Sequence, residues 1–195
     1  MRVLYIDLDT CRADHLGANG YHRNTSPTID RIAEEGVTFT HCYAANTPCL
    51  PSRASLLTGR FGINNGVVTN DSVADHGKHQ DLRPFWYGHR MDPEKPFLQH
   101  HLWSQGMKTV SFSPFHDRHN AWWFAAGWEE LHTFTHNKGD RETAHKLNKA
   151  FLPWLRIHGQ EDNWFVHLNY WDIHAPYEIT KEWADRFADD PPPPW

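Results

Sequence analysis

Residues 1–9 read MRVLYIDLD, a mostly apolar run that ends in acidic side chains. Aliphatic, β-branched and aromatic residues favour buried strands, so we expect a first strand here. Ser26 and Pro27 are typical of the start of a helix, and Gly36 is typical of its end. Residues 37–40 (VTFT) predict another strand. A strand, a helix and a strand in this order indicate a parallel βαβ unit.

The same alternation continues through the rest of the chain. The pattern predicts a helix over residues 97–105, a strand over 108–113, a helix over 141–158 and a strand over 164–169. Residues 61–96 show no sustained period, so we expect a long loop excursion near the pocket. Alternating strands and helices indicate an α/β fold with a mostly parallel sheet, and we interpret residues 1–195 as a single domain.

Composition narrows the classes of function. The 195 residues carry a formal net charge of -5 without a basic stripe, which argues against nucleic acid as a partner. The three cysteines, Cys11, Cys42 and Cys49, have no paired spacing, so a disulfide framework is not expected. No apolar run approaches the roughly 18 residues of a membrane span, and the first apolar run is too short for a signal peptide. As written, we expect a cytoplasmic protein, or an exported one if an upstream signal was lost.

Polar side chains gather where the predicted strands end. Asp9 ends the first strand, and polar segments follow Ser113 and Asn169. The loop that contains Cys49 follows the strand predicted at residues 37–40. In open parallel sheets, ligands bind at the carboxyl ends of the strands. We therefore expect these four segments to converge on one crevice.

Residues 49–60 read CLPSRASLLTGR and are the most informative stretch for function. Pro51 suits the first turn of a helix, which places Cys49 at or just before the helix N-terminus. Unpaired backbone N–H groups and the positive end of the helix dipole favour an anion there. Arg53 follows one turn later, where its planar guanidinium can brace a nucleophile or pair with an oxyanion. Gly59 predicts the end of the helix.

This stretch resembles the signature of the formylglycine-dependent sulfatases, Cys-x-Pro-Ser-Arg followed by Leu-Thr-Gly-Arg. The resemblance implies that a formylglycine-generating maturation enzyme oxidises Cys49 to formylglycine, with Arg53 as its partner. Of the two hydroxyls of the hydrated aldehyde, one would attack sulfur and the other would expel sulfate, which is nucleophilic catalysis in two steps. It also implies a three-layer α/β/α sandwich of the alkaline-phosphatase type. Family members are much longer, so we expect an N-terminal portion whose C-terminal strands are missing.

Residues 7–17 (DLDTCRADHLG) resemble the family's first-strand motif, in which two adjacent acids end the strand. Asp9 aligns with the first acid, a ligand of a divalent cation, and carboxylates suit Ca²⁺ or Mg²⁺. Thr10 stands in place of the second acid. Asp7 lies on the same side of the strand as Asp9 and is either a replacement ligand or a buried hydrogen-bonding group. The resemblance thus implies a metal site that contains Asp9 and the modified Cys49, and Asp7 is a further candidate ligand from its place on the strand.

Two histidines resemble sulfate-binding residues of the family. Residues 169–177 (NYWDIHAPY) resemble its His-x-Pro-Tyr segment, which implies that His174 contacts the sulfate and protonates the leaving oxygen. The segment SPFHDRH stands where the family has Gly-Lys-x-His, and it aligns His116 with the family histidine. Pro114 replaces the family lysine, so either Arg118 supplies the positive charge or the site lacks it.

Together these features predict a sulfatase that hydrolyses a sulfate ester of a small molecule or carbohydrate. The sequence contains 10 tryptophans and 16 histidines, and aromatic faces suit a sugar ring, so we favour a sulfated carbohydrate. Two alternatives stay open. A phosphonate or phosphate monoester hydrolase of the same superfamily would use the same nucleophile on phosphorus. A non-catalytic, truncated fragment would keep the fold without the reaction.

Overall fold

The computed structural model describes residues 1–70, 97–119, 121–134, 143–175, 177 and 180–190. These residues belong to two compact units. The first unit comprises residues 1–7 and 44–171, and the second unit comprises residues 8–43 and 172–195. The first unit contains the sheet and its covering helices. In its described part, the second unit consists of short helices and irregular segments.

Within the described residues, the first unit is built on a four-stranded sheet with the order β1-β4-β2-β3. The strands are β1 (Arg2–Leu8), β2 (Lys108–Phe112), β3 (Glu130–His132) and β4 (Trp164–Tyr170). β2 runs parallel to both neighbours, with Val110 opposite Val166 on one side and Glu130 on the other. The predicted α/β fold with a parallel sheet is confirmed, as are three of the predicted strands.

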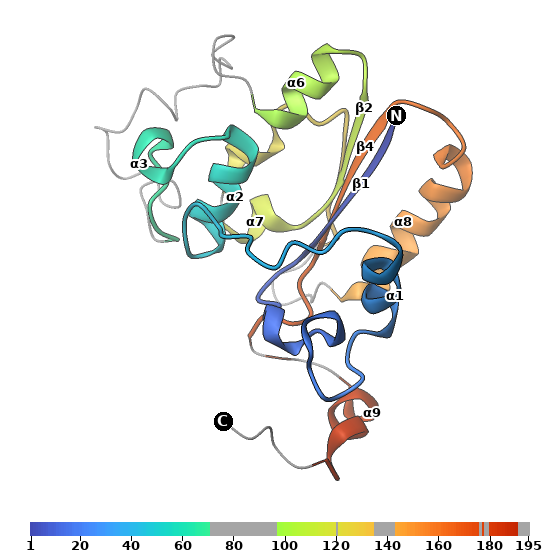
Figure 1. The fold of residues 1–195 in the computed structure, drawn as a ribbon. Coiled ribbons are helices and arrows are strands. Elements are labelled where there is room, and N and C mark those ends of the chain that lie inside the picture. The colour runs from blue at the N-terminus through green and yellow to red at the C-terminus, as the bar shows by residue number, and fades with distance from the viewer. Residues whose placement is uncertain (71–96, 120, 135–142, 176, 178–179, 191–195) are drawn as a thin grey trace. The chain divides into compact units, whose positions relative to one another are not determined.

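Helices cover both faces of this sheet (Figure 1). On one side lie α2 (Cys49–Thr58), α3 (Gly62–Asn65), α6 (Leu98–Ser104), α7 (Phe115–Arg118) and the short η4 (Trp122–Ala125). On the other side lies α8 (Ala144–His158). The sheet therefore forms the middle of three layers, as the sequence predicts.

Two apolar clusters hold these layers together, one on each face of the sheet. Alternate residues of a strand point to opposite faces. Phe112 and Val166 thus pack against the α8 side, where Phe151 is buried with them. The other cluster contains Leu50 of α2 and Phe115 of α7. The functional stretch that begins at Cys49 is therefore anchored in the core of the first unit.

Several sequence-based boundaries can be compared with the structure. Helix α6 lies within the predicted range 97–105, and α8 continues through Pro153 to His158. The three-residue strand β3 was not predicted, because so short a segment carries no alternation that distinguishes it from a loop. Helix α3 lies inside the predicted loop excursion at 61–96, and residues 71–96 lie outside the described residues.

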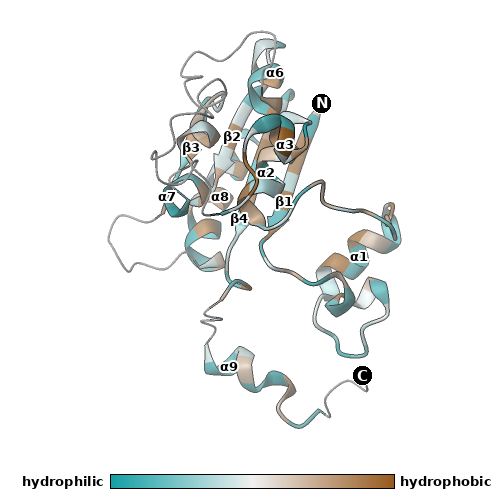
Figure 2. Cartoon of the chain, turned by 90° about the vertical axis from the view of Figure 1, so that its left-hand side faces the viewer, coloured by the Kyte–Doolittle hydropathy of each residue, from teal (hydrophilic) through white to brown (hydrophobic). Residues whose placement is uncertain are grey.

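The second unit contains α1 (Pro27–Glu35), bounded by Ser26 and Gly36 as predicted. Its other elements are η1 (Ala13–His15), η2 (Gly17–Asn19), α9 (Lys181–Ala184) and η5 (Asp185–Phe187). Apolar brown and polar teal residues are both present on α1 in Figure 2. Ile32 on this helix is nevertheless 62% exposed, so this apolar side chain is not buried among the described residues.

The strand predicted at residues 37–40 is wrong. This segment is irregular, and Val37 and Phe39 are 79% and 78% exposed. A strand is stabilised by hydrogen bonds to a neighbouring strand and by burial of one face. Among the described residues, the four strands of the sheet do not include this segment. The predicted βαβ unit therefore does not form here, although its first strand and its helix do.

Candidate active site

Cys49 is the first residue of α2, at the helix N-terminus that the sequence predicts. Pro48 precedes it, and the Ser52 N–H donates to the Pro48 carbonyl at 3.0 Å. Leu50 is fully buried and fixes this end of the helix in the core, while Gly59 ends the helix with φ 64°. A left-handed residue of this kind favours glycine. Cys49 itself is half-buried beside the positive end of the helix.

Two side chains from other elements contact the Cys49 sulfur. Asn70 Nδ2 donates to Sγ at 3.3 Å, and His119 Nε2 lies 3.5 Å from the same atom. Asn70 follows α3, and His119 follows α7 at the carboxyl end of β2. The sulfur is therefore held by groups that come from two other parts of the first unit.

Trp171, which follows β4, supports this end of α7. The rings of His119 and Trp171 meet edge to face with centroids 5.8 Å apart. The Arg118 guanidinium lies over the same Trp171 ring, with Cζ 4.5 Å from its centroid. The segments that follow β2 and β4 thus meet near Cys49, as expected for the carboxyl ends of parallel strands.

The sequence reasoning selected His116 and passed over both His119 and Asn70. His116 is buried, stacks on Phe124 with centroids 6.5 Å apart, and lies 3.3 Å from the Asp117 carboxylate. Burial lowers the pKa of His116, and Asp117 opposes this effect. His119 lies four residues after Phe115, and their ring centroids are 4.7 Å apart, but this helical spacing does not by itself indicate a contact with Cys49.

Arg53 forms a largely buried ion pair with Asp7, with Nη2 2.7 Å from Oδ2. Asn169 Nδ2 donates to the same carboxylate oxygen at 3.3 Å, and His167 Nε2 lies 3.9 Å away. Ser113 donates to the Asn169 side-chain carbonyl at 3.2 Å. The network links α2 to β1, to β4 and to the residue that follows β2.

Burial and neighbouring charges shift the pKa values of Asp7 and His167 in opposite directions. Burial alone would raise the pKa of Asp7, but the contact with His167 and the charge of Arg53 outweigh it, so the pKa lies below the ordinary value. Burial lowers the pKa of His167, and Asp7 only partly opposes this. Asp7 is therefore ionised at neutral pH, His167 is neutral, and the positive charge of Arg53 is balanced.

A pocket lies beside this network. Its walls are almost entirely apolar and include Tyr5, Leu57 and Phe165, and Arg53 and His167 also line it. Cys49 does not line this pocket. The pocket is therefore separate from the candidate nucleophile.

The remaining predicted site residues belong to the second unit. Asp9 is 3% exposed, and its Oδ1 accepts a hydrogen bond from the Thr10 hydroxyl at 2.8 Å. Thr10 has φ 61°, an unusual value for a β-branched residue and a form of strain that is frequent at functional sites. His174 Nδ1 lies 2.7 Å from the Ala175 carbonyl.

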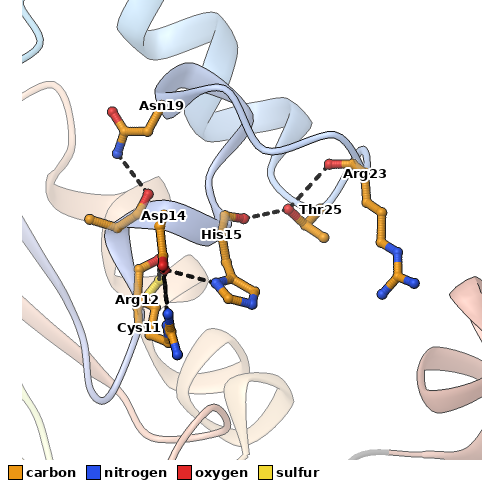
Figure 3. A network of polar contacts seen from close by, with 8 residues as sticks. Cys11, Arg12, Asp14, His15, Asn19, Arg23 and Thr25 are labelled. Carbon is orange, nitrogen blue, oxygen red and sulfur yellow. Dashed lines mark hydrogen bonds and ion pairs between the residues drawn. The ribbon is translucent and has the colours of Figure 1, made fainter. Parts of the chain in front are cut away.

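A second network of polar side chains surrounds the turn after Asp9 (Figure 3). Arg12 Nε donates to Asp14 at 2.9 Å, and His15 Nδ1 lies 2.9 Å from the same carboxylate. These hydrogen bonds hold the pKa of Asp14 well below its ordinary value. Thr25 donates to the His15 carbonyl at 2.6 Å. The network stabilises the turn rather than presenting a free carboxylate.

The described residues do not by themselves provide a complete metal site. Among them, no group of three or more His, Cys, Asp or Glu side chains gathers around one point. Asp7, one of the expected ligands, is already paired with Arg53. A full ligand set would therefore need donors in addition to the described residues. The described part of the chain also contains no helix with the length and apolar character needed to cross a membrane.

Comparison with known proteins identifies the family of this chain. The sulfatase family model matches residues 2–194. The N-acetylgalactosamine-6-sulfatase of Mus musculus is 49% identical over 72 residues, which are 37% of this chain and 14% of that protein. The matched stretch is thus a small part of the length of this relative.

Two solved structures share the fold. A protein determined in complex with its substrate D-glucosamine-2-N,6-O-disulfate has a TM-score of 0.72 at 18% identity, over 98% of this chain and 38% of that chain. The phosphonate monoester hydrolase of Agrobacterium radiobacter has a TM-score of 0.63 at 20% identity, over 92% of this chain and 42% of that chain. These likenesses confirm the predicted three-layer α/β/α fold of the alkaline-phosphatase type.

Proposed function

This chain belongs to the sulfatase family, and we propose that it carries the nucleophile of an enzyme that hydrolyses sulfate esters. The observation that supports this most directly is the position of Cys49. It lies at the N-terminus of α2, in contact with His119 and Asn70 and one turn before Arg53. A helix N-terminus favours a bound anion, and a histidine near a nucleophile can move a proton.

We propose that Cys49 acts after conversion to formylglycine by a formylglycine-generating maturation enzyme. When hydrated, formylglycine supplies a hydroxyl nucleophile that a thiol side chain lacks. His119 is suited to accept a proton from a group at this position, because its Nε2 lies 3.5 Å from Sγ. Arg118, held over Trp171, provides the positive charge that the sequence lacks at Pro114.

The other predicted site residues keep distinct proposed roles. Arg53 is balanced by Asp7, so we assign it to positioning α2 and the sulfate end of the substrate. His174 is proposed to protonate the leaving oxygen, and His116 to stabilise charge on the transferred group. His116 is buried against Phe124, whereas His119 touches the nucleophile. The two histidines can therefore be separated by mutation.

A divalent cation, Ca²⁺ or Mg²⁺, is proposed to bind with Asp9 as its best-placed protein ligand. Asp9 is buried and offers the carboxylate oxygens that such ions prefer. Asp7 and the modified Cys49 are the other expected ligands, although Asp7 is engaged by Arg53. When bound there, the ion would polarise the sulfate oxygens as a Lewis acid.

The proposed substrate class is a sulfated carbohydrate. One relative is named for action on a sulfated amino sugar, and one solved structure was determined with a disulfated glucosamine. A phosphonate monoester hydrolase is the second candidate, since a protein of that name shares the fold. These similarities concern only part of each relative, so the substrate needs a direct test.

The test is turnover by the whole chain co-expressed with a maturation enzyme. Sulfated N-acetylgalactosamine and 4-nitrophenyl sulfate would be compared with 4-nitrophenyl phosphate and the monoester 4-nitrophenyl phenylphosphonate, with Cys49→Ala as the inactive control. We expect release of sulfate that depends on Cys49. Faster release from the phosphorus esters would favour the second candidate. Full conversion of Cys49 without any turnover would indicate a non-catalytic part of a larger protein.

The same assay separates the two histidines near α7. We expect His119→Ala to lower kcat by about 100-fold or more, as is typical for loss of a proton-transfer group. His116→Ala, on the helix α7 that His119 directly follows, is the comparison variant, and its effect should be smaller. A larger loss in His116→Ala would assign the proton transfer to His116 instead.

A further inference from the structure

The side chain of Asn70 bridges Cys49 and the start of α2. Its Oδ1 accepts a hydrogen bond from the Leu50 N–H at 3.0 Å. Its Nδ2 donates to Cys49 Sγ at 3.3 Å, and the thiol lies 3.5 Å from Oδ1. One amide group therefore contacts both the helix backbone and the atom that the proposed reaction would replace.

This contact satisfies a backbone group that the helix cannot satisfy itself. The first N–H groups of a helix have no partner within it, and a side chain at the N-cap often accepts from them. Here the N-cap is Pro48, whose side chain has no acceptor. Pro51 lacks an N–H, and the Ser52 N–H donates to the Pro48 carbonyl. The first turn also contains the N–H groups of Cys49 and Leu50, and Asn70 accepts from that of Leu50.

The segment that carries Asn70 is tied firmly to the end of α2. Asn65 Oδ1 accepts from the Val67 N–H at 2.9 Å, and its Nδ2 donates to the Arg60 carbonyl at 3.1 Å. The Asn65 side chain is completely buried. These bonds fix the path from α2 through α3, so that Asn70 returns to the first turn of the same helix.

We propose that Asn70 is a positioning residue for the nucleophile, an inference that rests on the proposed function of Cys49. A side-chain amide both donates and accepts hydrogen bonds, so it can hold a thiol before maturation and hydroxyl groups after it. Asn70 thereby orients residue 49 against the helix N-terminus and toward His119.

The unmodified thiol tests this proposal without any sulfatase activity. The whole chain is expressed without a maturation enzyme, and alkylation by iodoacetamide is followed from pH 6 to 10 by mass spectrometry. The tryptic peptide 32–53 contains both Cys49 and the exposed Cys42, which serves as an internal reference. Fragment ions distinguish the two cysteines.

Asn70→Asp is the informative variant, because it keeps the acceptor for Leu50 and places a carboxylate against the sulfur. We expect the alkylation midpoint of Cys49 to rise by about one pH unit, which lowers its rate about tenfold near neutral pH. Cys42 should not change. Asn64→Asp is the matched control, since Asn64 is exposed on α3 and the charge change is the same. Asn70→Ala should shift the midpoint in the same direction by less.

Two results would overturn the proposal. The first is that the pH profile of Cys49 alkylation is the same in Asn70→Asp and Asn64→Asp, while both variants unfold at the same temperature. The other is an equal shift at Cys42 and Cys49, which would indicate a general change in accessibility. Neither outcome bears on whether the matured chain cleaves sulfate esters, so failure of this inference is distinguishable from failure of the proposed function.

Discussion

The two units of the chain hold their charged side chains in different ways. In the first unit, Arg53 and Asp7 are paired with little exposure and are joined to Asn169 at the end of β4. In the second unit, Arg12 and Asp14 form an exposed pair on a turn. The first unit also contains both apolar clusters, whereas Asp9 and Ser26 are the buried residues of the described part of the second.

This difference separates two groups of proposed functional residues, a nucleophile end in the first unit and a metal end in the second. The nucleophile end is preorganised by a core that the chain itself supplies, because α2 is anchored through Leu50 and its polar partners come from the same unit. The proposed metal end depends on Asp9, which lies in a unit with little apolar burial. Mutations in the two units should therefore have very different consequences.

The largest expected difference concerns apolar side chains. Phe115→Ala should lower the free energy of unfolding by about 3–5 kcal/mol, because it opens a cavity where the wild-type ring is fully buried. Ile32→Ala in the second unit should change it by less than about 0.5 kcal/mol, since Ile32 is mostly exposed. Urea denaturation of both variants measures the contrast. Equal losses of unfolding free energy would show that Ile32 is as well buried in the folded chain as Phe115.

The next difference concerns the ion pairs. Arg53→Ala leaves the Asp7 carboxylate largely buried without its counter-charge, and we expect a loss of about 3 kcal/mol. The double variant Arg53→Ala with Asp7→Asn should recover part of that loss. Arg12→Ala should have a small effect that disappears at high salt. If Arg53→Ala behaved like Arg12→Ala in the same urea experiment, the buried network would not contribute to stability.

A smaller effect should appear in the dependence of stability on pH. The pKa values of His116 and His167 lie below their ordinary value of 6.5, mainly because both side chains are buried. Below that pH the unfolded chain binds protons that the folded chain does not, so stability falls as pH falls. The slope is at most about 1.4 kcal/mol per pH unit for each histidine.

Thermal unfolding between pH 7.5 and 5.5 measures this slope. His167→Gln should reduce the slope, by at most about 1.4 kcal/mol per pH unit, because one titrating histidine is removed. An unchanged slope in that variant would show that His167 does not titrate differently in the folded and unfolded chain.

Much of the fold could be predicted from local sequence patterns. Strands β1, β2 and β4, the limits of α1 and the start of α2 at Cys49 follow from apolar runs and from the positions of proline and glycine. The prediction of a strand at 37–40 was wrong, because a strand requires neighbouring strands and a local sequence pattern does not specify them.

The candidate site was predicted less completely. The motif identified Cys49 and Arg53, but alignment on spacing favoured His116, whereas the turn of α7 brings His119 to the sulfur. Asn70 lies 21 residues beyond Cys49 in the sequence, and only the path through α3 returns it to the helix start. Contacts of this kind depend on tertiary structure and leave no regular signal in the sequence.

The most direct test of the central claim is the chemical state of Cys49 after co-expression with a formylglycine-generating maturation enzyme. Peptide mass spectrometry of residues 32–53 reports it, and Cys42 in the same peptide is the internal control. We predict that Cys49 is converted to the aldehyde, that Cys42 stays a thiol, and that conversion is absent in Cys49→Ala. An unmodified Cys49 under conditions that convert a known sulfatase would contradict the proposal that this residue becomes the nucleophile.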